Sequence, residues 1–287
     1  DKVVHEFGKQ AYDVIIAVGG GSVLDMAKIL NIVHANGGTV GPYLVGDRAI
    51  KHRGLPLVAI PTTAGSGSQA THFSVLYQEG IKYSIAHSTM LPDVAVVDPE
   101  LTYAMSPYLT AVTGVDALAQ AIESYWSVNA NDESKGYSRE AMRSIIGNLE
   151  EAVLCPTGYA REMMAIGAHF AGKAINIAKT TAPHALSYAF TARHGIAHGH
   201  AVALTLPAFF LFNAGVTDAD VMDRRGSTYV RAAMHDICVL MGCKTVGQAV
   251  ERLHVLIRNV GLADSFEGFG VVDDAAKRKI IESLNLE

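Results

Sequence analysis

Short apolar runs and one helix-like stretch alternate along the first hundred residues. Residues 12–18 and 55–60 are apolar runs rich in β-branched side chains, and helical periodicity over residues 23–33 follows the first run. Continuous apolar runs are typical of buried parallel strands. The pattern therefore predicts α/β structure, with further strands at residues 70–77 and 93–97.

The pattern changes near residue 106, where glycine and proline become rarer. Apolar positions then recur three and four residues apart, as on the buried face of an amphipathic helix. The predicted helices cover residues 106–128, 134–154, 160–178, 227–241 and 246–260. We therefore expect an α/β domain over residues 1–106 and an all-helical domain over residues 107–287.

Composition and charge narrow the class of protein. Hydrophobic residues make up 49% of the 287 residues and charged residues 18%, which allows a large core and excludes global disorder. The net charge of −5 argues against a broad surface that binds nucleic acid.

Three scattered cysteines exclude a disulfide framework and favour a reducing, cytoplasmic location. The longest apolar run, residues 201–216, is too short to span a membrane.

A glycine-rich loop, Gly19-Gly20-Gly21-Ser22, joins the first predicted strand to the first predicted helix. Glycine lets backbone amides approach an anion closely, and a helix N-terminus adds partial positive charge. The loop is therefore a candidate site for a pyrophosphate. The alternative is a tight strand–helix turn in which Ser22 caps the helix.

A second loop of small polar residues, 61–68, follows the predicted strand at 55–60 and carries the hydroxyl groups of Thr62, Thr63 and Ser66. Ligands of open parallel sheets gather beyond the carboxyl ends of the strands. The two loops would therefore face one crevice, which favours nucleotide binding over an ordinary flexible loop.

Asp116 and Gln120 are candidate metal ligands near the start of a predicted helix. A spacing of four residues places both side chains on one helix face, within reach of a common ion. The alternative is structural, since Thr113 and Asp116 have the spacing of a capping box.

Four histidines fall within a short stretch: His184, His194, His198 and His200. Neutral imidazole is a common metal ligand. Gly195 and Gly199 argue against a regular helix there and favour a loop that crosses back to the segment carrying His184. We expect two of the four to be ligands, with His184 as one of them, and the other two to support the site or the fold.

Five motifs, in the order of the chain, resemble the iron-containing (group III) alcohol dehydrogenase family. They are residues 17–28 (AVGGGSVLDMAK), 60–68 (IPTTAGSGS), 91–99 (LPDVAVVDP), 113–118 (TGVDAL) and 198–203 (HGHAVA). The resemblance implies the dehydroquinate synthase-like fold of that family. In it a nucleotide-binding α/β domain precedes an all-helical metal-binding domain, and the active site lies in the cleft between them. It also implies an earlier βαβ portion and further C-terminal helices, so the parallel sheet is expected to be incomplete.

Site residues follow from the resemblance by matching position. The cofactor, NAD or NADP, would contact Gly19, Gly20, Gly21, Ser22, Asp25, Thr62, Thr63, Ser66, Lys82 and Leu91. Fe²⁺, with Zn²⁺ as the alternative, would be bound by Asp116, His184 and His198, with Gln120 where the family has a histidine ligand. The implied reaction is hydride transfer between a nicotinamide and the carbonyl carbon of an aldehyde, with the metal as Lewis acid.

A second departure from the family concerns proton transfer. The family has a histidine where this chain has Tyr188, so Tyr188 or His194 is the candidate proton-relay residue. These departures, together with residues 120–127 and 180–188, resemble the phosphonoacetaldehyde reductases of phosphonate metabolism. Lys179 and Arg193 flank the His184 segment and would bind the phosphonate, or else are ordinary surface charges.

The expected function is reduction of a small aldehyde such as phosphonoacetaldehyde, or oxidation of the corresponding alcohol. The resemblance implies a homodimer or larger assembly, and neither a nucleic acid nor a membrane is expected as a partner. One alternative keeps the fold but changes the reaction, as in glycerol dehydrogenase-like polyol dehydrogenases or sugar-phosphate cyclases. Another is a metal-poor nucleotide-binding relative without turnover, which Gln120 and Tyr188 favour.

Overall fold

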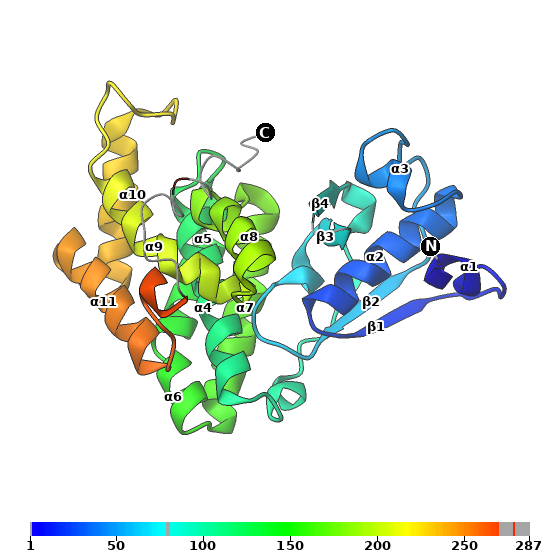
Figure 1. Cartoon of the computed structure of the whole chain (residues 1–287), viewed down its shortest axis with the longest axis horizontal. Coiled ribbons are helices and arrows are strands. Elements are labelled where there is room, and N and C mark those ends of the chain that lie inside the picture. Colours follow the sequence, from blue (N-terminus) through cyan, green and yellow to red (C-terminus); the bar gives the residue numbers. More distant parts are fainter. Residues whose placement is uncertain (1, 79–80, 270–277, 279–287) are drawn as a thin grey trace.

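The computed structural model describes residues 2–78, 81–269 and 278. Figure 1 shows an α/β part beside a part built from helices. The α/β part contains α1 (Lys2–Phe7), β1 (Ile15–Gly19), α2 (Gly21–Asn36), α3 (Gly41–Leu44), β2 (Leu57–Pro61), η1 (Ser68–Ala70), β3 (Phe73–Gln78), β4 (Ile81–Ala86), η2 (Ser88–Met90), β5 (Val94–Ala95) and η3 (Pro99–Thr102). The helical part contains α4 (Pro107–Trp126), α5 (Asp132–Ile146), α6 (Leu149–Leu154), α7 (Gly158–Ala178), α8 (Ala182–His194), α9 (His198–Ala214), α10 (Ser227–Leu240), α11 (Val246–Asn259) and η4 (Phe266–Phe269).

The strands form a small parallel sheet and a separate hairpin. The sheet has the order β1-β2-β5, and β3 pairs with β4 in antiparallel fashion. Ile15 and Ala17 of β1 lie opposite Leu57 and Ala59 of β2, and all four pack against α2. Ile16, between them, is 60% exposed. Among the described residues β1 is thus buried on one face, which corrects the prediction of a strand buried along its whole length. A continuous apolar run does not show how many layers cover a strand.

Helix α4 runs through the middle of the helical part. Every residue from Gly114 to Trp126 is buried, and its apolar side chains share one core with α5, α7, α9, α10 and α11. The hydroxyl of Ser106 caps the helix by accepting a hydrogen bond from the amide of Leu109 at 3.2 Å, and Pro107 occupies the first turn. A helix enclosed in this way is a rigid support for the polar side chains that it carries into the core.

Most predicted helices are confirmed, and one is divided. Residues 106–128, 160–178, 227–241 and 246–260 correspond to α4, α7, α10 and α11. The predicted helix over residues 134–154 is instead two helices, α5 and α6. Gly147 and Asn148 separate them, because both residue types are poor helix formers.

The histidine-rich stretch forms two helices, which corrects the prediction of a loop. Gly195 ends α8 in the left-handed conformation, with φ of 65°, and its amide donates to the carbonyl of Thr191 at 3.1 Å. Gly199 lies inside α9 and does not break it. A Cβ atom on Gly199 would lie 2.1 Å from the carbonyl oxygen of Val112. This glycine therefore lets α9 approach α4 closely and does not mark a turn.

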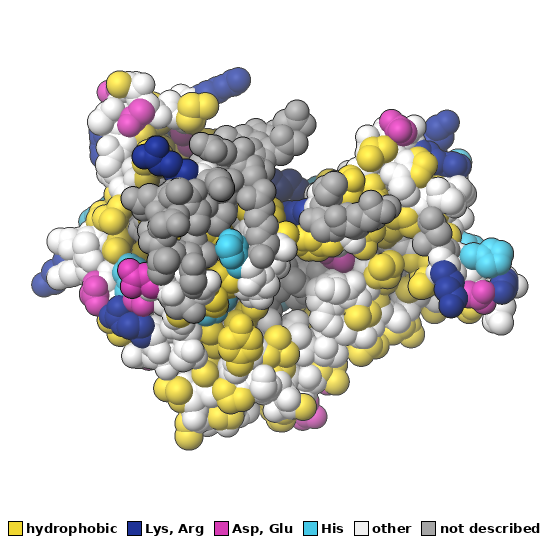
Figure 2. All heavy atoms as spheres, in the orientation of Figure 1, with side chains coloured by type: hydrophobic (Ala, Val, Ile, Leu, Met, Phe, Trp, Pro, Cys, Tyr) yellow, Lys and Arg dark blue, Asp and Glu magenta, His cyan; other side chains and the backbone are white. Residues whose placement is uncertain are grey.

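The outer surface shows no single basic patch on the face drawn in Figure 2, where Lys and Arg side chains are spread over both parts. Within the described ranges, we find no helix with the length and apolar character that crossing a membrane requires.

Candidate functional site

Three of the predicted metal ligands come together where α4, α8 and α9 meet. Asp116, His184 and His198 each offer a ligand atom, and these atoms lie within 4.8 Å of one another. The Oδ1 atom of Asp116 is 3.2 Å from Nε2 of His184 and 3.8 Å from Nε2 of His198. Asp116 and His184 are buried, whereas the side chain of His198 is 36% exposed. One carboxylate and two imidazoles are ligands that commonly bind a divalent transition metal.

Hydrogen bonds on the far side of each ring set the tautomers. Nδ1 of His184 donates to Oε1 of Glu123. The hydroxyl of Ser187 donates to the carbonyl of His184 at 2.6 Å, so it accepts from Nδ1 of His198, 3.1 Å away. In their neutral forms both rings therefore direct an unprotonated Nε2 toward Asp116. This is the tautomer that a metal ligand needs.

Glu123 is a second buried carboxylate behind the cluster. It is fully buried, and its Oε2 accepts hydrogen bonds from the amide and the hydroxyl of Thr181 at 2.6 and 2.8 Å. In the described part of the chain, the ion-pair partners of Glu123 and Asp116 are histidines and not lysine or arginine. Because buried negative charges need a compensating charge, a divalent cation matches this site.

The buried charges of this cluster, together with burial itself, set the pKa values of its histidines and of Asp116. Burial disfavours the imidazolium of His184, but the charges of Glu123 and Asp116 outweigh it and raise the pKa of His184 to about 9. Burial also disfavours ionisation of Asp116, yet the hydrogen bond from His184 and the nearby His198 hold the pKa of Asp116 below its usual range. Burial lowers the pKa of His198 to about 4, so this ring is neutral near pH 7.

Gln120 adds a buried amide group beside Asp116. One turn after Asp116, its Nε2 donates to Oδ2 of Asp116 at 3.2 Å. Its Oε1 is buried and has no hydrogen-bond partner among the described residues. A buried carbonyl oxygen without a partner is costly, and a cation beside Asp116 would satisfy it. One carboxylate, two imidazoles and one amide oxygen therefore form a donor set that fits Fe²⁺ or Zn²⁺.

The capping-box alternative for this segment is wrong. Thr113 lies inside α4, where its hydroxyl donates to the carbonyl of Leu109 at 2.8 Å. The helix begins at Pro107, and Ser106 is its N-cap. Asp116 is thus a mid-helix residue whose carboxylate points into the site.

Of the remaining residues in the histidine-rich stretch, Tyr188 is at the site and two histidines lie away from it. The Tyr188 ring stacks on His198, with centroids 5.4 Å apart and planes 4° from parallel. His194 is the exposed last residue of α8, about 15 Å along the helix axis from His184. His200 is buried, and its Nε2 donates to the carbonyl of Ala263 at 2.7 Å, which is a structural contact.

The glycine-rich loop leads directly into α2. Gly20 is the N-cap of α2 and the helix has no side-chain cap, so the alternative in which Ser22 caps it is wrong. The first intrahelical hydrogen bond is the one from the amide of Val23 to the carbonyl of Gly20. The amides of Gly21 and Ser22 precede it, and amides at this position of a helix are suited to binding a phosphate.

The second predicted loop touches the first. A Cβ atom on Gly21 would lie 2.6 Å from Oγ of Ser66, and one on Gly20 would lie 3.5 Å from the side chain of Thr63. A larger residue at Gly21 would push the loops apart. The structure thus brings together the two loops that the sequence places at neighbouring strand ends.

The second loop also packs against the helix that carries the metal ligands. A Cβ atom on Gly65 would lie 2.7 Å from Cβ of Thr113, and one on Gly67 would lie 2.4 Å from Cα of Gly172 in α7. Thr113 is one turn before Asp116. These contacts place the second loop directly against α4 and α7, one turn from Asp116 on α4.

Two further predicted cofactor residues have protein partners. The oxygens of Asp25 accept hydrogen bonds from the hydroxyl of Ser68 at 2.5 Å and from the amide of Val75 at 2.8 Å. Asp25 therefore holds the second loop and the hairpin to α2. Nζ of Lys82, on β4, lies over the Tyr188 ring, 3.1 Å from its centroid. Burial lowers the pKa of Lys82 to about 8, and Asp25 opposes this shift.

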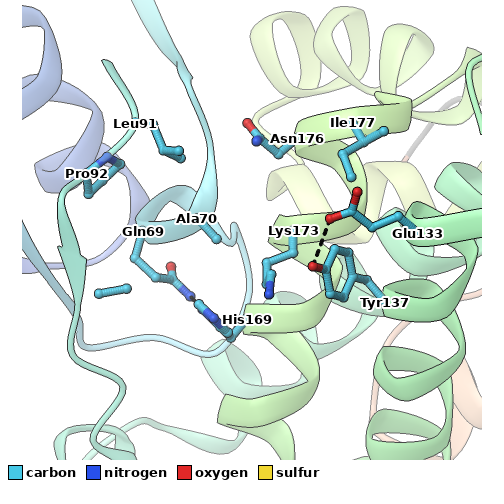
Figure 3. Close-up of a pocket in the computed structure, with 11 residues that line it drawn as sticks. Gln69, Ala70, Leu91, Pro92, Glu133, Tyr137, His169, Lys173, Asn176 and Ile177 are labelled. Carbon is cyan, nitrogen blue, oxygen red and sulfur yellow. Dashed lines mark hydrogen bonds between the residues drawn. The ribbon is translucent and has the colours of Figure 1, made fainter. Parts of the chain in front are cut away.

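Leu91 lies at a different hollow, shown in Figure 3. The hollow has a volume of about 370 Å³, and η1, β5, α5 and α7 contribute to its walls. His169 and Lys173 of α7 line it together with Gln69 and Leu91. The glycine-rich loop is not among the residues that line this hollow.

Sequence reasoning missed Glu123 and Ser187, which fix the two histidine rings. Glu123 lies seven residues after Asp116, two turns along the same helix face, so its spacing was a usable signal. Ser187 follows His184 by three residues, but its contact with His198 depends on the turn between α8 and α9 and has no signal in the spacing.

Comparison with known proteins gives matches over most of the chain. Residues 1–99 match the family model for "Iron-containing alcohol dehydrogenase", and residues 110–283 match that for "Fe-containing alcohol dehydrogenase family, C-terminal". Long-chain-alcohol dehydrogenase 1 of Geobacillus thermodenitrificans is 37% identical over 270 residues, which are 92% of this chain and 66% of that protein. Phosphonoacetaldehyde reductase of Streptomyces viridochromogenes is 34% identical over 264 residues, 87% of this chain and 65% of that protein. The chain thus spans slightly less than two thirds of the length of these relatives.

Solved structures share the fold. Sulfoacetaldehyde reductase of Bifidobacterium kashiwanohense, in complex with NAD⁺, superposes with a TM-score of 0.87 at 30% identity and covers 98% of this chain and 72% of its own. An iron-containing alcohol dehydrogenase of Thermotoga maritima superposes with a TM-score of 0.81 at 30% identity. It covers 100% of this chain and 72% of its own.

Proposed function

Because this chain belongs to the iron-containing alcohol dehydrogenase family, we propose that it carries out metal-dependent, NAD(P)-linked interconversion of an alcohol and its aldehyde. One observation supports this most strongly. Asp116, His184 and His198 direct ligand atoms to one point, beside a buried Gln120 oxygen that lacks a partner in the described structure.

The proposed metal site consists of Asp116, Gln120, His184 and His198, with Fe²⁺ as the ion and Zn²⁺ as the alternative. When bound, such an ion supplies Lewis-acid polarisation of a substrate carbonyl. The chain's own part is to orient the ligands. Glu123 fixes the ring of His184, and α4 holds Asp116 and Gln120 in the core.

The proposed cofactor site lies between the two loops of the α/β part. The amides of Gly20, Gly21 and Ser22 would bind the pyrophosphate, with Gly19 setting the turn. The hydroxyls of Thr62, Thr63 and Ser66 would line the adenosine and nicotinamide-ribose side. Asp25 would act by holding the second loop in place, and Lys82 by its position on β4 beside Tyr188. Leu91, at the hollow of Figure 3, is the member of the predicted set with the least support.

Relatives support NAD over NADP and a small aldehyde as substrate. One matching structure is a complex with NAD⁺, and two of the similar proteins, by their names, reduce phosphonoacetaldehyde and sulfoacetaldehyde. We therefore propose an aldehyde with an anionic group, phosphonoacetaldehyde first. The relative at 37% identity is a long-chain-alcohol dehydrogenase, which makes a long-chain aldehyde the competing substrate.

Lys179 is the proposed partner of the anionic group. It is the C-cap of α7, and its positive φ of 65° is strained for a lysine, a kind of strain that is often retained at functional sites. Its Nζ lies 3.1 Å from Nε2 of His72 and 4.7 Å from the ring centroid of Phe73. No carboxylate in the described part forms an ion pair with it. The side chain of Arg193, the second sequence candidate, lies outside the described residues.

The positions of Tyr188 and His194 bear on which of them could act as the proton-relay residue. His194 is exposed at the end of α8, away from the metal cluster, so we do not propose it for this role. Tyr188 is in contact with the cluster, because its ring stacks on that of His198. We also propose that the chain divides between residues 106 and 107 into a nucleotide-binding domain and a metal-binding domain. We further propose a homodimer, and light scattering would test this by measuring the molar mass in solution.

Turnover with three aldehydes tests the proposal. The protein is loaded anaerobically with Fe²⁺ or Zn²⁺, and NADH oxidation is followed with phosphonoacetaldehyde, acetaldehyde and dodecanal. We expect activity with the first, lost in Asp116→Asn and retained in Glu140→Gln, a matched control on an exposed carboxylate. Lys179→Met should lower kcat/KM about tenfold for phosphonoacetaldehyde and leave kcat/KM for acetaldehyde unchanged.

Turnover of dodecanal alone would favour the long-chain alternative. Oxidation of glycerol would favour the polyol alternative, and a protein that binds NADH without metal or turnover would be the inactive relative.

A further inference from the structure

His198 is the more weakly held of the two histidines in the cluster. His184 is buried on all sides and bound to Glu123, whereas the His198 side chain is 36% exposed. His198 is also the first residue of α9, directly after the turn that follows α8. One hydrogen bond, 3.1 Å long, joins its Nδ1 to Ser187. This hydrogen bond orients the ring at Nδ1, and the His184 ring lies against it in a T-shaped contact with centroids 5.3 Å apart. A contact on the face of the ring is what remains to reinforce its plane.

The Tyr188 ring supplies that contact. It lies parallel to the His198 ring within 4°, at a centroid distance of 5.4 Å, which is an offset stack. Tyr188 is one turn after His184 on α8, and Ser187 lies between them in sequence. The same helix therefore presents His184, the hydroxyl that binds His198 and the ring that stacks on it.

The α/β part holds this ring from its own side. Nζ of Lys82, on β4, lies 3.1 Å from the centroid of the Tyr188 ring, a cation–π contact. No carboxylate forms an ion pair with Lys82 in the described ranges, so the ring is the close partner of this ammonium group. The contact joins the hairpin to the metal cluster through Tyr188.

We infer that Tyr188 is a positioning residue for the metal ligand His198. Its ring, held by Lys82, keeps the His198 ring in the plane that directs Nε2 to Asp116. This rests on the metal site proposed above, but it departs from the relay role that the sequence predicts for Tyr188. What matters is the aromatic face, so the hydroxyl group is dispensable.

The test separates the ring from the hydroxyl. Tyr188→Phe keeps the ring, Tyr188→Leu removes it, and Tyr159→Leu is a matched control on an exposed tyrosine of α7. The metal-free protein, labelled with ¹⁵N-histidine, reports the tautomer of His198. Co²⁺ titration reports affinity and, by its visible absorption bands, the geometry of the ligands. Circular dichroism and a melting curve check that each variant folds.

We expect wild type, Tyr188→Phe and Tyr159→Leu to show one His198 tautomer, protonated on Nδ1, and Co²⁺ affinities within about twofold of one another. Tyr188→Leu should show averaged ring nitrogens and bind Co²⁺ about tenfold more weakly, with changed absorption bands. Lys82→Met should weaken Co²⁺ binding by a smaller factor. If Tyr188→Leu fails to fold, Lys82→Met carries the test, and an unchanged tautomer and affinity in it would overturn the inference.

Two other outcomes would overturn the inference. One is a Tyr188→Leu protein that keeps a single tautomer and the wild-type Co²⁺ spectrum. The other is a Tyr188→Phe protein that binds Co²⁺ normally but loses about a hundredfold or more in turnover, as loss of a general acid does. Failure of the proposed metal site gives a different result from failure of this inference. Wild type would then bind no Co²⁺, and the tautomer measurement on the metal-free protein would still report whether Tyr188 orients His198.

Discussion

Glu123 accepts a hydrogen bond from Nδ1 of His184, and both side chains are buried behind the cluster that Asp116 and His198 complete. A carboxylate in this position fixes the ring orientation of a metal-binding histidine and leaves Nε2 free to coordinate. Glu123 also brings a second negative charge into the core. The pair therefore accounts for the orientation of the His184 ring and adds a negative charge that would favour a dication at the proposed metal site.

Replacing Glu123 by glutamine should weaken metal binding. Glutamine has nearly the same shape but lacks the charge that holds the Nδ1 proton of His184. We expect Glu123→Gln to lower the affinity for Zn²⁺ or Fe²⁺ about 10- to 100-fold, measured by competition with a chelator. Glu140→Gln, on the exposed surface, should bind as wild type does. Equal affinity in both variants would show that Glu123 does not support the metal.

Metal uptake should release a proton near neutral pH. The pKa of His184 is raised to about 9 in the folded protein, whereas its ordinary value is 6.5, so the ring is protonated at pH 7.5 and must lose that proton to coordinate. His198, with its pKa lowered to about 4, has no proton to lose there. Calorimetry of metal binding in buffers of different ionisation enthalpy should give about one proton per ion at pH 7.5. The value should approach zero above pH 9, and a value of zero at pH 7.5 would contradict the assignment.

The same pKa shift sets the pH dependence of stability in the metal-free protein. A folded-state pKa above the unfolded value stabilises the fold wherever the group is protonated. The contribution of His184 is complete below pH 6.5 and is lost as the pH rises toward 9. Urea unfolding of the metal-free protein should therefore show falling stability across this window. His184→Gln should flatten this part of the curve, and an unchanged slope would contradict the pKa assignment.

Substitutions of Gln120 by a stronger ligand and by a residue that cannot bind a metal test whether it is the fourth ligand. Its Oε1 is buried beside Asp116, and an amide oxygen is a weaker ligand than an imidazole nitrogen. We expect Gln120→His to tighten Zn²⁺ binding and Gln120→Leu to weaken it, each by about tenfold. Asp132→Asn, in the exposed first turn of α5, serves as a surface control. Affinities that do not change in either Gln120 variant would place its oxygen outside the coordination sphere.

Gly199 should be intolerant of a side chain. A Cβ atom there would lie 2.1 Å from the carbonyl oxygen of Val112 and 2.7 Å from Cβ of Asp116. Gly199→Ala should therefore separate α9 from α4 and destabilise the fold by about 1–3 kcal/mol in urea unfolding. Gly136→Ala, in α5 with open space around it, is the matched control and should stabilise by about 0.5–1 kcal/mol. Equal stabilities would show that the helices adjust without cost.

Parts of the site with a local signal were predictable from the sequence. The glycine-rich loop and the Thr62–Ser66 loop were placed at one crevice because parallel strands end on one side, and the structure puts them in contact. The motifs around Asp116, His184 and His198 were recognised by family resemblance. From spacing alone, the capping box was favoured over a metal ligand for Asp116, and the structure overturns that interpretation by placing Ser106 at the N-cap.

The rest depends on contacts between distant segments. Gly195 and Gly199 look alike in sequence, but one ends a helix and the other lets α9 touch α4. The stack of Tyr188 on His198 and the contact with Lys82 join α8, α9 and β4, which no local pattern relates. The exposure of Ile16 follows from which elements cover the sheet, and an apolar run does not contain that information.

The most direct test of the central claim is the metal content of the protein purified anaerobically with Fe²⁺ and Zn²⁺ supplied. Elemental analysis of wild type should give about one ion per chain, because the four proposed ligands form a single site. Asp116→Ala and His198→Ala should remain folded and retain no ion, whereas Glu140→Gln should match wild type. Wild type without metal, or an ion retained in both ligand variants, would contradict the claim that Asp116, His184 and His198 form a metal site.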